Sequence, residues 1–344
     1  MVYNGGKQTP IFKSVQRNRK KILGGRDSVK VAIVQYSNPY LDRSGTIDVA
    51  CKAIREAASN GAKFIVFPEN WVAGYPYWSP GWNTDMGKFR QSFVRWHDAA
   101  IMIGTEDTER LGAAAAAADA YMAIGCNEMD PRIESDQIFS SILLLNPDGS
   151  ILGVHRKTMP TSQEKMFWGM GDARDLKVFE TEIGNIGALI CGEHSMTPLK
   201  CALMAQREDF HVSVWHGSFH LTKGPTLVED DETQATFIGR PLSRSYAIES
   251  GAFVPMACTW LDPNDIPDDF PYKKGDPDFR NLQSLEWRQR HHQSDGNDDD
   301  RASDRETGHR LCRLPRLDAK GPRRHIGYLR SLWQTGLGSS AGKG

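Results

Sequence analysis

The stretch NIGALICGEH at residues 185–194 decides how the rest of the chain can be interpreted. Its apolar run at 186–190 predicts a buried strand, and Gly192 predicts a sharp turn directly after Cys191. Pro198, followed by apolar residues at helical spacing, predicts a helix beyond the turn. A strand, a turn that carries a nucleophile and a helix form a nucleophile elbow, in which the helix N-terminus favours a thiolate. A cysteine that ends an apolar strand is also a common packing residue, so the rest of the chain has to decide between the two interpretations.

The composition predicts a globular α/β protein that binds neither nucleic acid nor a membrane. The chain has 344 residues, of which 39% are hydrophobic, and this is enough for a substantial core. Its formal net charge of -1 argues against the basic surface that nucleic acids and anionic membranes attract. We expect neither a membrane span nor a signal peptide. The six cysteines lack close-paired spacing, which predicts reduced thiols, a cytoplasmic location and no cysteine metal site.

Between residues 29 and 261 the hydrophobic pattern alternates between strands and helices. Predicted strands at 31–34 and 64–67 flank a predicted helix at 47–58, which is the pattern of a parallel βαβ unit. The turn NPDG at 146–149 predicts a hairpin. The remaining predicted strands lie at 121–125, 138–145, 151–154, 176–179, 211–215 and 253–258. The remaining predicted helices lie at 89–103, 111–118 and 199–205, and within 233–248.

Two charged residues follow predicted strands in the same way as Cys191 does. Glu69 comes just after the strand at 64–67, at the edge where open α/β sheets bind their ligands. Lys157 follows the second strand of the hairpin. Either charge alone is typical of a solvated surface, so only their combination with Cys191 indicates a function.

A loop rich in aromatic rings, at residues 71–82, follows Glu69. Proline and glycine interrupt the loop too often for regular structure. Its rings either pack beneath the loop or form the wall of a pocket for a small apolar ligand.

Taken together, the motifs resemble those of the nitrilase (carbon–nitrogen hydrolase) superfamily. The segments FPE at 67–69, HRKTMPT at 155–161 and CGE at 191–193 occur in the order and at the spacing of that family's Glu-Lys-Cys triad. With WGMGD at 168–172, they are most similar to the nitrilase branch, and the resemblance extends over residues 29–261. It implies an α/β protein with a four-layer α-β-β-α sandwich and a hydrolase without a cofactor.

The resemblance also implies a role for each candidate residue. Cys191 is the nucleophile, Glu69 the proton acceptor and Lys157 the charge stabiliser. Glu164 supports them, either by holding the lysine or by orienting the substrate. We assign substrate binding to aromatic residues and to the residues after the nucleophile: Trp71, Tyr75, Trp168, Gly192, Glu193 and His194.

The implied reaction is the hydrolysis of a nitrile to a carboxylic acid and ammonia, through a thioimidate and a thioester on the cysteine. The rings after Glu69 favour an aromatic or arylaliphatic nitrile. A cyanide hydratase or an amidase of the same superfamily is an alternative, because CGEH is similar to cyanide-converting members and because spacing does not determine how the intermediate breaks. An inactive scaffold that only binds is a further alternative. Homo-oligomers are usual in this family, so we expect a dimer or a larger assembly.

A metal site offers a different interpretation of the histidines. A zinc ion would need a common face for His194, His211, His216 and His220, but the intervals between the last three straddle a strand and the loop after it. We therefore expect no metal and no cofactor.

Both ends of the chain differ from the segment between them. Residues 1–28 are polar, which predicts a flexible extension. Apolar periodicity is lost after residue 261, so residues 262–344 are expected to form a disordered, charged tail or to result from a reading frame disturbed near residues 285–292. A tail of that kind would leave two sheet edges open.

Overall fold

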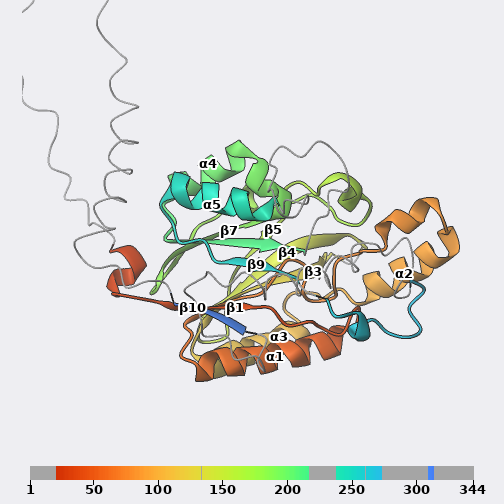
Figure 1. Ribbon diagram of the computed structural model, residues 1–344, viewed down its shortest axis with the longest axis horizontal. Coiled ribbons are helices and arrows are strands. Elements are labelled where there is room, and N and C mark those ends of the chain that lie inside the picture. Colours follow the sequence, from red (N-terminus) through yellow and green to blue (C-terminus); the bar gives the residue numbers. More distant parts are fainter. Residues whose placement is uncertain (1–20, 133, 217–237, 260, 273–308, 314–344) are drawn as a thin grey trace, which may run out of the picture.

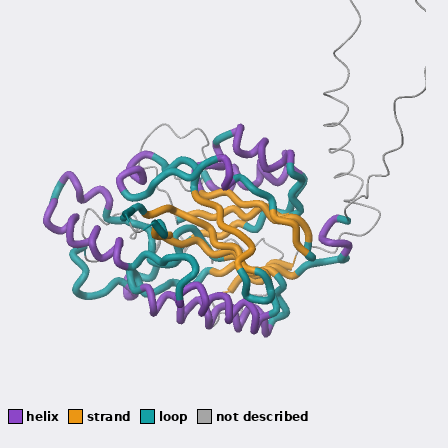
Figure 2. The backbone as a smooth tube through the Cα atoms, turned by 180° about the vertical axis from the view of Figure 1, so that it is seen from behind, coloured by secondary structure: helices purple, strands orange, loops and turns teal. Residues whose placement is uncertain are grey.

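Two β-sheets lie face to face in the centre of the protein, and helices cover both outer faces (Figure 1). The computed structural model describes residues 21–132, 134–216, 238–259, 261–272 and 309–313. Figure 2 shows the same layers from behind, with the strands enclosed between helices. The four-layer α-β-β-α sandwich expected from the sequence is confirmed.

The first sheet contains the predicted βαβ unit and the predicted hairpin. Its strand order is β10-β1-β2-β3-β4-β5, in which β1, β2 and β3 are parallel to one another and β3, β4 and β5 are antiparallel neighbours. The strands are β1 (Lys30–Val34), β2 (Phe64–Val66), β3 (Tyr121–Met129), β4 (Ile138–Leu145), β5 (Ile151–Arg156) and β10 (His309–Arg313).

The second sheet contains the apolar strand that ends directly before Cys191. Its order is β6-β7-β8-β9, and β7, β8 and β9 are parallel. The strands are β6 (Phe179–Thr181), β7 (Gly184–Ile190), β8 (Phe210–Trp215) and β9 (Met256–Cys258).

Alternation along the strands distributes side chains between the layers. Ala32 and Val34 of β1 pack with helices α1 and α3, whereas Val31 packs in the core between the two sheets. On the other side, Leu189 packs with Leu203 of α4 and Tyr246 of α5. The helices are α1 (Arg43–Ser59), α2 (Met86–Asp98), α3 (Glu106–Ala118), α4 (Thr197–Ala205) and α5 (Gly239–Ser250).

Helix α2 lies at one end of the sandwich, beside a separate aromatic core (Figure 1). The predicted helix at 89–103 begins earlier, because Asp85 caps α2 by accepting the Lys88 N–H, and it ends at Asp98. Ile101, at the end of that prediction, instead forms a β-bridge with Glu128. No helix in the described ranges combines the length and the apolar character that a membrane span requires.

The structure corrects the predicted boundaries at both ends. Leu23, within the extension expected to be flexible, is buried in the core between the sheets, and residues 1–20 lie outside the described residues. The expected end of the folded domain at residue 261 is wrong, because Phe270 and Tyr272 are fully buried in the aromatic core. The sequence could not show this, since burial of these rings depends on partners such as Tyr40, whose ring centroid lies 5.4 Å from that of Phe270.

The edge of β1 is also not open. β10 pairs with β1 in an antiparallel register in which Lys30 is opposite Arg313 and Val34 is opposite His309. The expectation of an unstructured tail is therefore wrong at residues 309–313. The reading-frame hypothesis concerns residues 285–292, which lie outside the described residues.

Candidate active site

Cys191 lies where β7 ends, as the sequence predicted. Its φ of 49° is in the left-handed region, which costs a residue with a side chain about 1–3 kcal/mol. The turn after it is a short 3-10 helix, Cys191–Ser195, and α4 begins only at Thr197. The predicted thiolate stabilisation by the N-terminus of α4 is therefore wrong, because that helix does not begin beside the sulfur.

The environment of the sulfur favours the protonated thiol. Burial raises the pKa of Cys191 well above its usual value, and the charge of Glu69 raises it further. The charge of Lys157 acts in the opposite direction, as does a hydrogen bond from the backbone of Gly192. A base must therefore remove the thiol proton before the sulfur can attack.

Glu69 is held close to β3 by backbone contacts on both sides of it. The Phe67 N–H donates to Ala123 O at 2.8 Å, and the Val72 N–H donates to Gly125 O at 3.0 Å. The approach requires glycine at 125, because an added Cβ would lie 2.1 Å from Pro68 O and 2.8 Å from Glu69 Cα. The carboxylate of Glu69 is thereby fixed in a buried position at the end of the sheet.

Lys157 is fully buried between two carboxylates. Its Nζ lies 2.8 Å from Glu69 Oε1 and 2.7 Å from Glu164 Oε2. Burial alone would lower the pKa of Lys157, but the two carboxylates outweigh it and raise that pKa well above its usual value. The structure therefore contains a permanent positive charge at this position.

Glu164 contacts both the lysine and the aromatic loop. Its Oε2 accepts the Thr161 N–H at 2.6 Å, and its Oε1 accepts the Tyr75 hydroxyl at 3.2 Å. Burial would raise the pKa of Glu164, but the charges of Lys157 and His216 and the hydrogen bonds from Lys157 and Thr161 together outweigh burial and lower that pKa. By contrast, burial raises the pKa of Glu69 to about 8 despite the same lysine, and Glu164 adds to this rise by repulsion.

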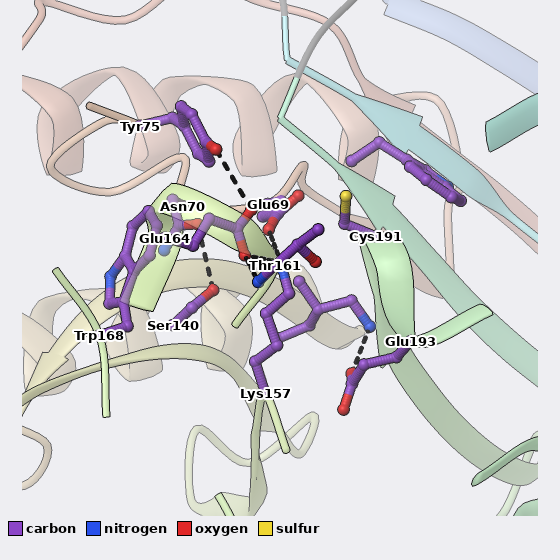
Figure 3. A network of polar contacts seen from close by, with 12 residues as sticks. Glu69, Asn70, Tyr75, Ser140, Lys157, Thr161, Glu164, Trp168, Cys191 and Glu193 are labelled. Carbon is purple, nitrogen blue, oxygen red and sulfur yellow. Dashed lines mark hydrogen bonds and ion pairs between the residues drawn. The ribbon is translucent and has the colours of Figure 1, made fainter. Parts of the chain in front are cut away.

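These groups converge although they are far apart in the chain (Figure 3). One carboxylate oxygen of Glu69, the sulfur of Cys191 and one ring nitrogen of His216 all lie within 4.8 Å of one another. The Lys157 ammonium contacts the same Glu69 carboxylate. A thiol, a raised-pKa carboxyl group and an ammonium in one buried site are the components of a thiol hydrolase.

The family model of the carbon–nitrogen hydrolases matches residues 30–282 of this chain. The chain belongs to this family. It is 34% identical to Nitrilase 2 of an unknown prokaryotic organism, over 67% of this chain and 68% of that protein. It is also 34% identical to Nitrilase 1 of Arabidopsis thaliana, over 70% of this chain and 64% of that protein. Bifunctional nitrilase/nitrile hydratase NIT4 of Oryza sativa subsp. japonica is 37% identical over 59% of this chain and 57% of that protein.

A solved structure shares the fold. Saccharomyces cerevisiae Nit3, a member of branch 10 of the nitrilase superfamily, aligns with a TM-score of 0.53 over 68% of this chain and 78% of that chain, at 19% identity. The family model and the relatives above place the protein in the nitrilase branch. It is a carbon–nitrogen hydrolase that acts through a cysteine, on bonds other than peptide bonds.

In this hydrolase, two of the predicted substrate-binding residues lie at the site. The ring of Tyr75 stacks on His216 with 3.7 Å between centroids, and its centroid lies 5.4 Å from that of Trp168. Trp71 is placed elsewhere. It packs on Phe67 in the core beneath α1 and donates its Nε1–H to Tyr36 O at 3.2 Å, so the structure corrects its assignment to substrate binding.

Glu193 and Gly192 hold the turn after Cys191 in place. Glu193 accepts hydrogen bonds from the backbones of Thr158 and Ile190, both at 2.8 Å, and contacts His155 Nε2 at 2.8 Å. Its assignment to substrate binding is corrected, because the carboxylate is fully buried and both of its oxygens are occupied by these partners. Gly192 lies against Thr161, where an added Cβ would be 2.6 Å from the hydroxyl oxygen.

His194 joins a buried chain of polar groups and is likewise not directed at the site. Its Nδ1 must donate to Cys191 O at 2.9 Å, because a carbonyl only accepts. Burial and the neighbouring His211 lower the pKa of His194 to about 3, so its Nε2 accepts from His211 Nε2 at 3.1 Å. His211 Nδ1 in turn contacts Glu208 Oε1 at 2.8 Å. This series of polar contacts holds the backbone carbonyl of Cys191 in place.

His216 is the site residue that sequence reasoning missed. The sequence grouped it with three other histidines, but it lies with Glu69 and Cys191, apart from the His194 and His211 pair; His220 is outside the described residues. The order of strands along the chain contained a signal that His216 would lie near Cys191. β7 and β8 are parallel, Ile190 is opposite Val214, and His216 directly follows β8. Residues that follow neighbouring parallel strands meet at one edge of a sheet.

Proposed function

We propose that this hydrolase converts a nitrile into a carboxylic acid and ammonia, with Cys191 as nucleophile, Glu69 as general base and Lys157 as the stabilising charge. The observation that carries the proposal is the convergence of the three groups, with the Lys157 Nζ 2.8 Å from Glu69 and the sulfur within 4.8 Å of the same carboxylate. The similarity to relatives named nitrilases supports the substrate class.

In the first step, Glu69 accepts the proton of the Cys191 thiol while the sulfur bonds to the nitrile carbon. The triple bond becomes a double bond, and Glu69 returns the proton to the nitrile nitrogen, which gives a thioimidate. The pKa of Glu69, raised to about 8 by burial, suits both transfers, because a catalytic group is most effective when its pKa is near the working pH.

In the second step, Glu69 activates a water molecule that adds to the thioimidate carbon. The tetrahedral product loses ammonia when its carbon–nitrogen bond breaks, and a thioester remains. A second water hydrolyses the thioester to the acid and regenerates the thiol. Lys157 stabilises negative charge that develops in these steps, and Glu164 positions Lys157 through their 2.7 Å contact.

The aromatic residues support an aromatic or arylaliphatic nitrile as substrate. The rings of Tyr75, Trp168 and His216 form one cluster, in which His216 lies beside the sulfur, Tyr75 stacks on His216 and Trp168 packs on Tyr75. Flat, mostly apolar walls favour ligands that are flat and apolar themselves. The cytoplasmic location and the homo-oligomeric assembly stay predictions.

Release of the amide is the second candidate, because one relative is named a bifunctional nitrilase/nitrile hydratase. The two outcomes differ only in which bond of the tetrahedral intermediate breaks. Loss of the Cys191 sulfur gives an amide, whereas loss of ammonia leads to the acid.

One experiment tests both outcomes. Purified protein is incubated with a panel of nitriles, cyanide included, and ammonia, acid and amide are measured together. Equal amounts of ammonia and acid from an arylaliphatic nitrile support the proposal, and amide alone identifies a hydratase. Formamide from cyanide identifies a cyanide hydratase. Tight binding without any product would identify a scaffold that is not a nitrile hydrolase.

A further inference from the structure

Three buried side chains with metal-ligating atoms meet at the sulfur. Glu69, Cys191 and His216 each offer one such atom, and these atoms lie within 4.8 Å of one another. All three side chains are buried, and each comes from a different part of the sandwich. Neither the sequence motifs nor the steps of hydrolysis assign a chemical role to His216.

We propose that this cluster, defined by Glu69, Cys191 and His216, binds a single zinc ion and that the bound ion blocks hydrolysis. Zinc prefers thiolate, imidazole and carboxylate ligands, with bonds of about 2.0–2.3 Å, so its ligand atoms lie roughly 3.3–3.8 Å apart. Small rotations of the side chains bring atoms that are within 4.8 Å into this range. The fourth position is left for water, as at other zinc sites with three protein ligands.

The hydrogen bonds of the cluster leave an oxygen of Glu69 available to the ion. Lys157 donates to Oε1 at 2.8 Å, whereas Oε2 is buried without a hydrogen-bond partner among the described residues. An orphaned buried oxygen is costly, and a metal ion would satisfy it.

The charges of the surroundings also match a divalent cation. When Cys191 is a thiolate, it carries one negative charge, as do the carboxylates of Glu69 and Glu164, and Lys157 contributes one positive charge. Two negative charges remain, which one zinc ion neutralises. Binding forms a zinc–sulfur bond and a zinc–oxygen bond, and it releases to solvent the thiol proton and, below pH about 8, the proton of the Glu69 carboxyl group.

The buried pair of His194 and His211 does not compete for the ion. The Nε2 atoms of His194 and His211 are hydrogen-bonded to each other, and their Nδ1 atoms are bonded to Cys191 O and to Glu208. The sulfur and the imidazole also select zinc over magnesium and calcium, which prefer oxygen ligands. The ion is therefore expected at His216 and not at the histidine pair.

Blocking follows from coordination, because the sulfur electron pair that would attack a substrate is used in the bond to zinc. This consequence rests on the proposed function, whereas binding itself does not. Inhibition should be reversed by a chelator, since no covalent bond to carbon forms.

The test uses cobalt(II) as a coloured probe for zinc on the full chain. Titration should give a thiolate-to-cobalt charge-transfer band that saturates at one equivalent and that zinc abolishes by displacement. In a second measurement that needs no variant, zinc should protect Cys191 from alkylation by iodoacetamide, as read by peptide mass spectrometry. The exposed Cys201 should be alkylated equally with and without zinc and serves as the internal control.

Variants locate the ion. Cys191→Ala should lose the band, and His216→Phe, which retains a ring to stack on Tyr75, should lower the affinity for cobalt by more than the roughly 10- to 100-fold caused by removing a hydrogen-bond partner of a ligand. The matched controls Cys201→Ala and His97→Asn should bind as the wild type does.

Three results would overturn the proposal: no cobalt band in the wild type, a band that survives in Cys191→Ala, or equal alkylation of Cys191 with and without zinc. These results are distinct from failure of the proposed function. If the protein shows the band but hydrolyses no nitrile, the metal site is supported and the proposed function is wrong. If the protein hydrolyses a nitrile but shows no band, the proposed function is supported and the metal site is wrong.

Discussion

At Cys191, backbone strain and burial act on the same residue. The left-handed φ of 49° presents the side chain at the end of β7, and the hydrogen bond from His194 to its carbonyl holds that conformation. Burial keeps the thiol protonated, so reactivity depends on the proton passing to Glu69. The nucleophile is thus activated during the reaction and is not a preformed thiolate.

Replacement of the nucleophile should separate chemistry from folding. Cys191→Ala should lower kcat for nitrile hydrolysis by at least about 10⁴-fold, because no other group can form the covalent intermediate. Circular dichroism should show an unchanged fold, since the change in volume is small. The exposed Cys201→Ala is the matched control and should retain wild-type kcat. Comparable activity in both variants would show that Cys191 is not the nucleophile.

The pH dependence should report the ionisation of Glu69. Its pKa, raised to about 8 by burial, means that kcat/KM increases with pH until the carboxylate predominates. Glu164→Gln removes a negative charge that raises the pKa of Glu69, so the part of the pH profile in which kcat/KM increases, its rising limb, should move to lower pH. Tyr75→Phe removes a hydrogen bond to Glu164 without changing its charge and should leave the limb in place. A limb that stays or moves to higher pH in Glu164→Gln would contradict the assignment.

At the scale of elements, the sequence could predict residues that follow strands. Glu69, Lys157 and Cys191 each follow a strand whose end is visible in the sequence. β2 and β5 belong to one sheet and β7 to the other, so the packing of the two sheets face to face brings these ends together. The aromatic loop could not be interpreted in this way, because it has no periodicity. Whether a ring such as Trp71 or Tyr75 faces the core or the site depends on tertiary packing.

The turn after the nucleophile could be predicted, but not the directions of its side chains. Glu193 and His194 follow Cys191 directly, and proximity in sequence favoured a role in substrate binding. In the structure, a 3-10 turn directs both toward buried polar partners, and only contacts with distant residues such as His155 and His211 reveal this.

Loss of the Glu193 charge should destabilise the fold in a pH-dependent way. Burial alone would raise the pKa of Glu193, but His155 and the hydrogen bonds of Thr158 outweigh it and lower that pKa to about 2. A depressed pKa contributes stability that is present above the unfolded value of 4.5 and is lost as the pH falls toward about 2. Glu193→Gln should therefore lower the free energy of unfolding by about 3–5 kcal/mol at pH 7.

Urea unfolding at pH 7 and at pH 4 measures this effect. The difference between the wild type and Glu193→Gln should be smaller at pH 4. Glu109→Gln, on the exposed side of α3, is the matched control and should change stability by less than about 0.5 kcal/mol at both pH values. A difference that grows on acidification would contradict the assigned ion pair.

At the scale of the whole molecule, the sandwich depends on segments beyond the predicted domain. The segment at 261–272 supplies Phe270 and Tyr272 to the aromatic core, and β10 covers the edge of β1. Neither contribution could be predicted, because HRLCR at 309–313 has no strand periodicity and its partner lies at the other end of the chain. The regular strands and helices between residues 29 and 261 predicted an α/β protein, and the four layers were predicted from the resemblance to the nitrilase superfamily.

Removal of β10 should expose the edge of β1. A chain that ends at residue 272 should aggregate more and unfold at a lower temperature than one that ends at residue 313, because an unpaired edge strand recruits other chains. Light scattering after size-exclusion chromatography and thermal unfolding by circular dichroism provide the comparison. Identical behaviour of the two chains would show that β10 does not protect the sheet.

The close approach of β3 to Glu69 has a consequence for the evolution of this enzyme. Since any side chain at position 125 would collide with the backbone around Pro68, even alanine should displace the general base, although Gly125 has no side chain that could take part in the reaction. Random mutagenesis followed by selection for growth on a nitrile as nitrogen source should therefore return clones without changes at this codon. Intolerance at this position would otherwise be interpreted as a role in substrate recognition, when its origin is the space that a single methyl group would occupy beside the backbone of Glu69.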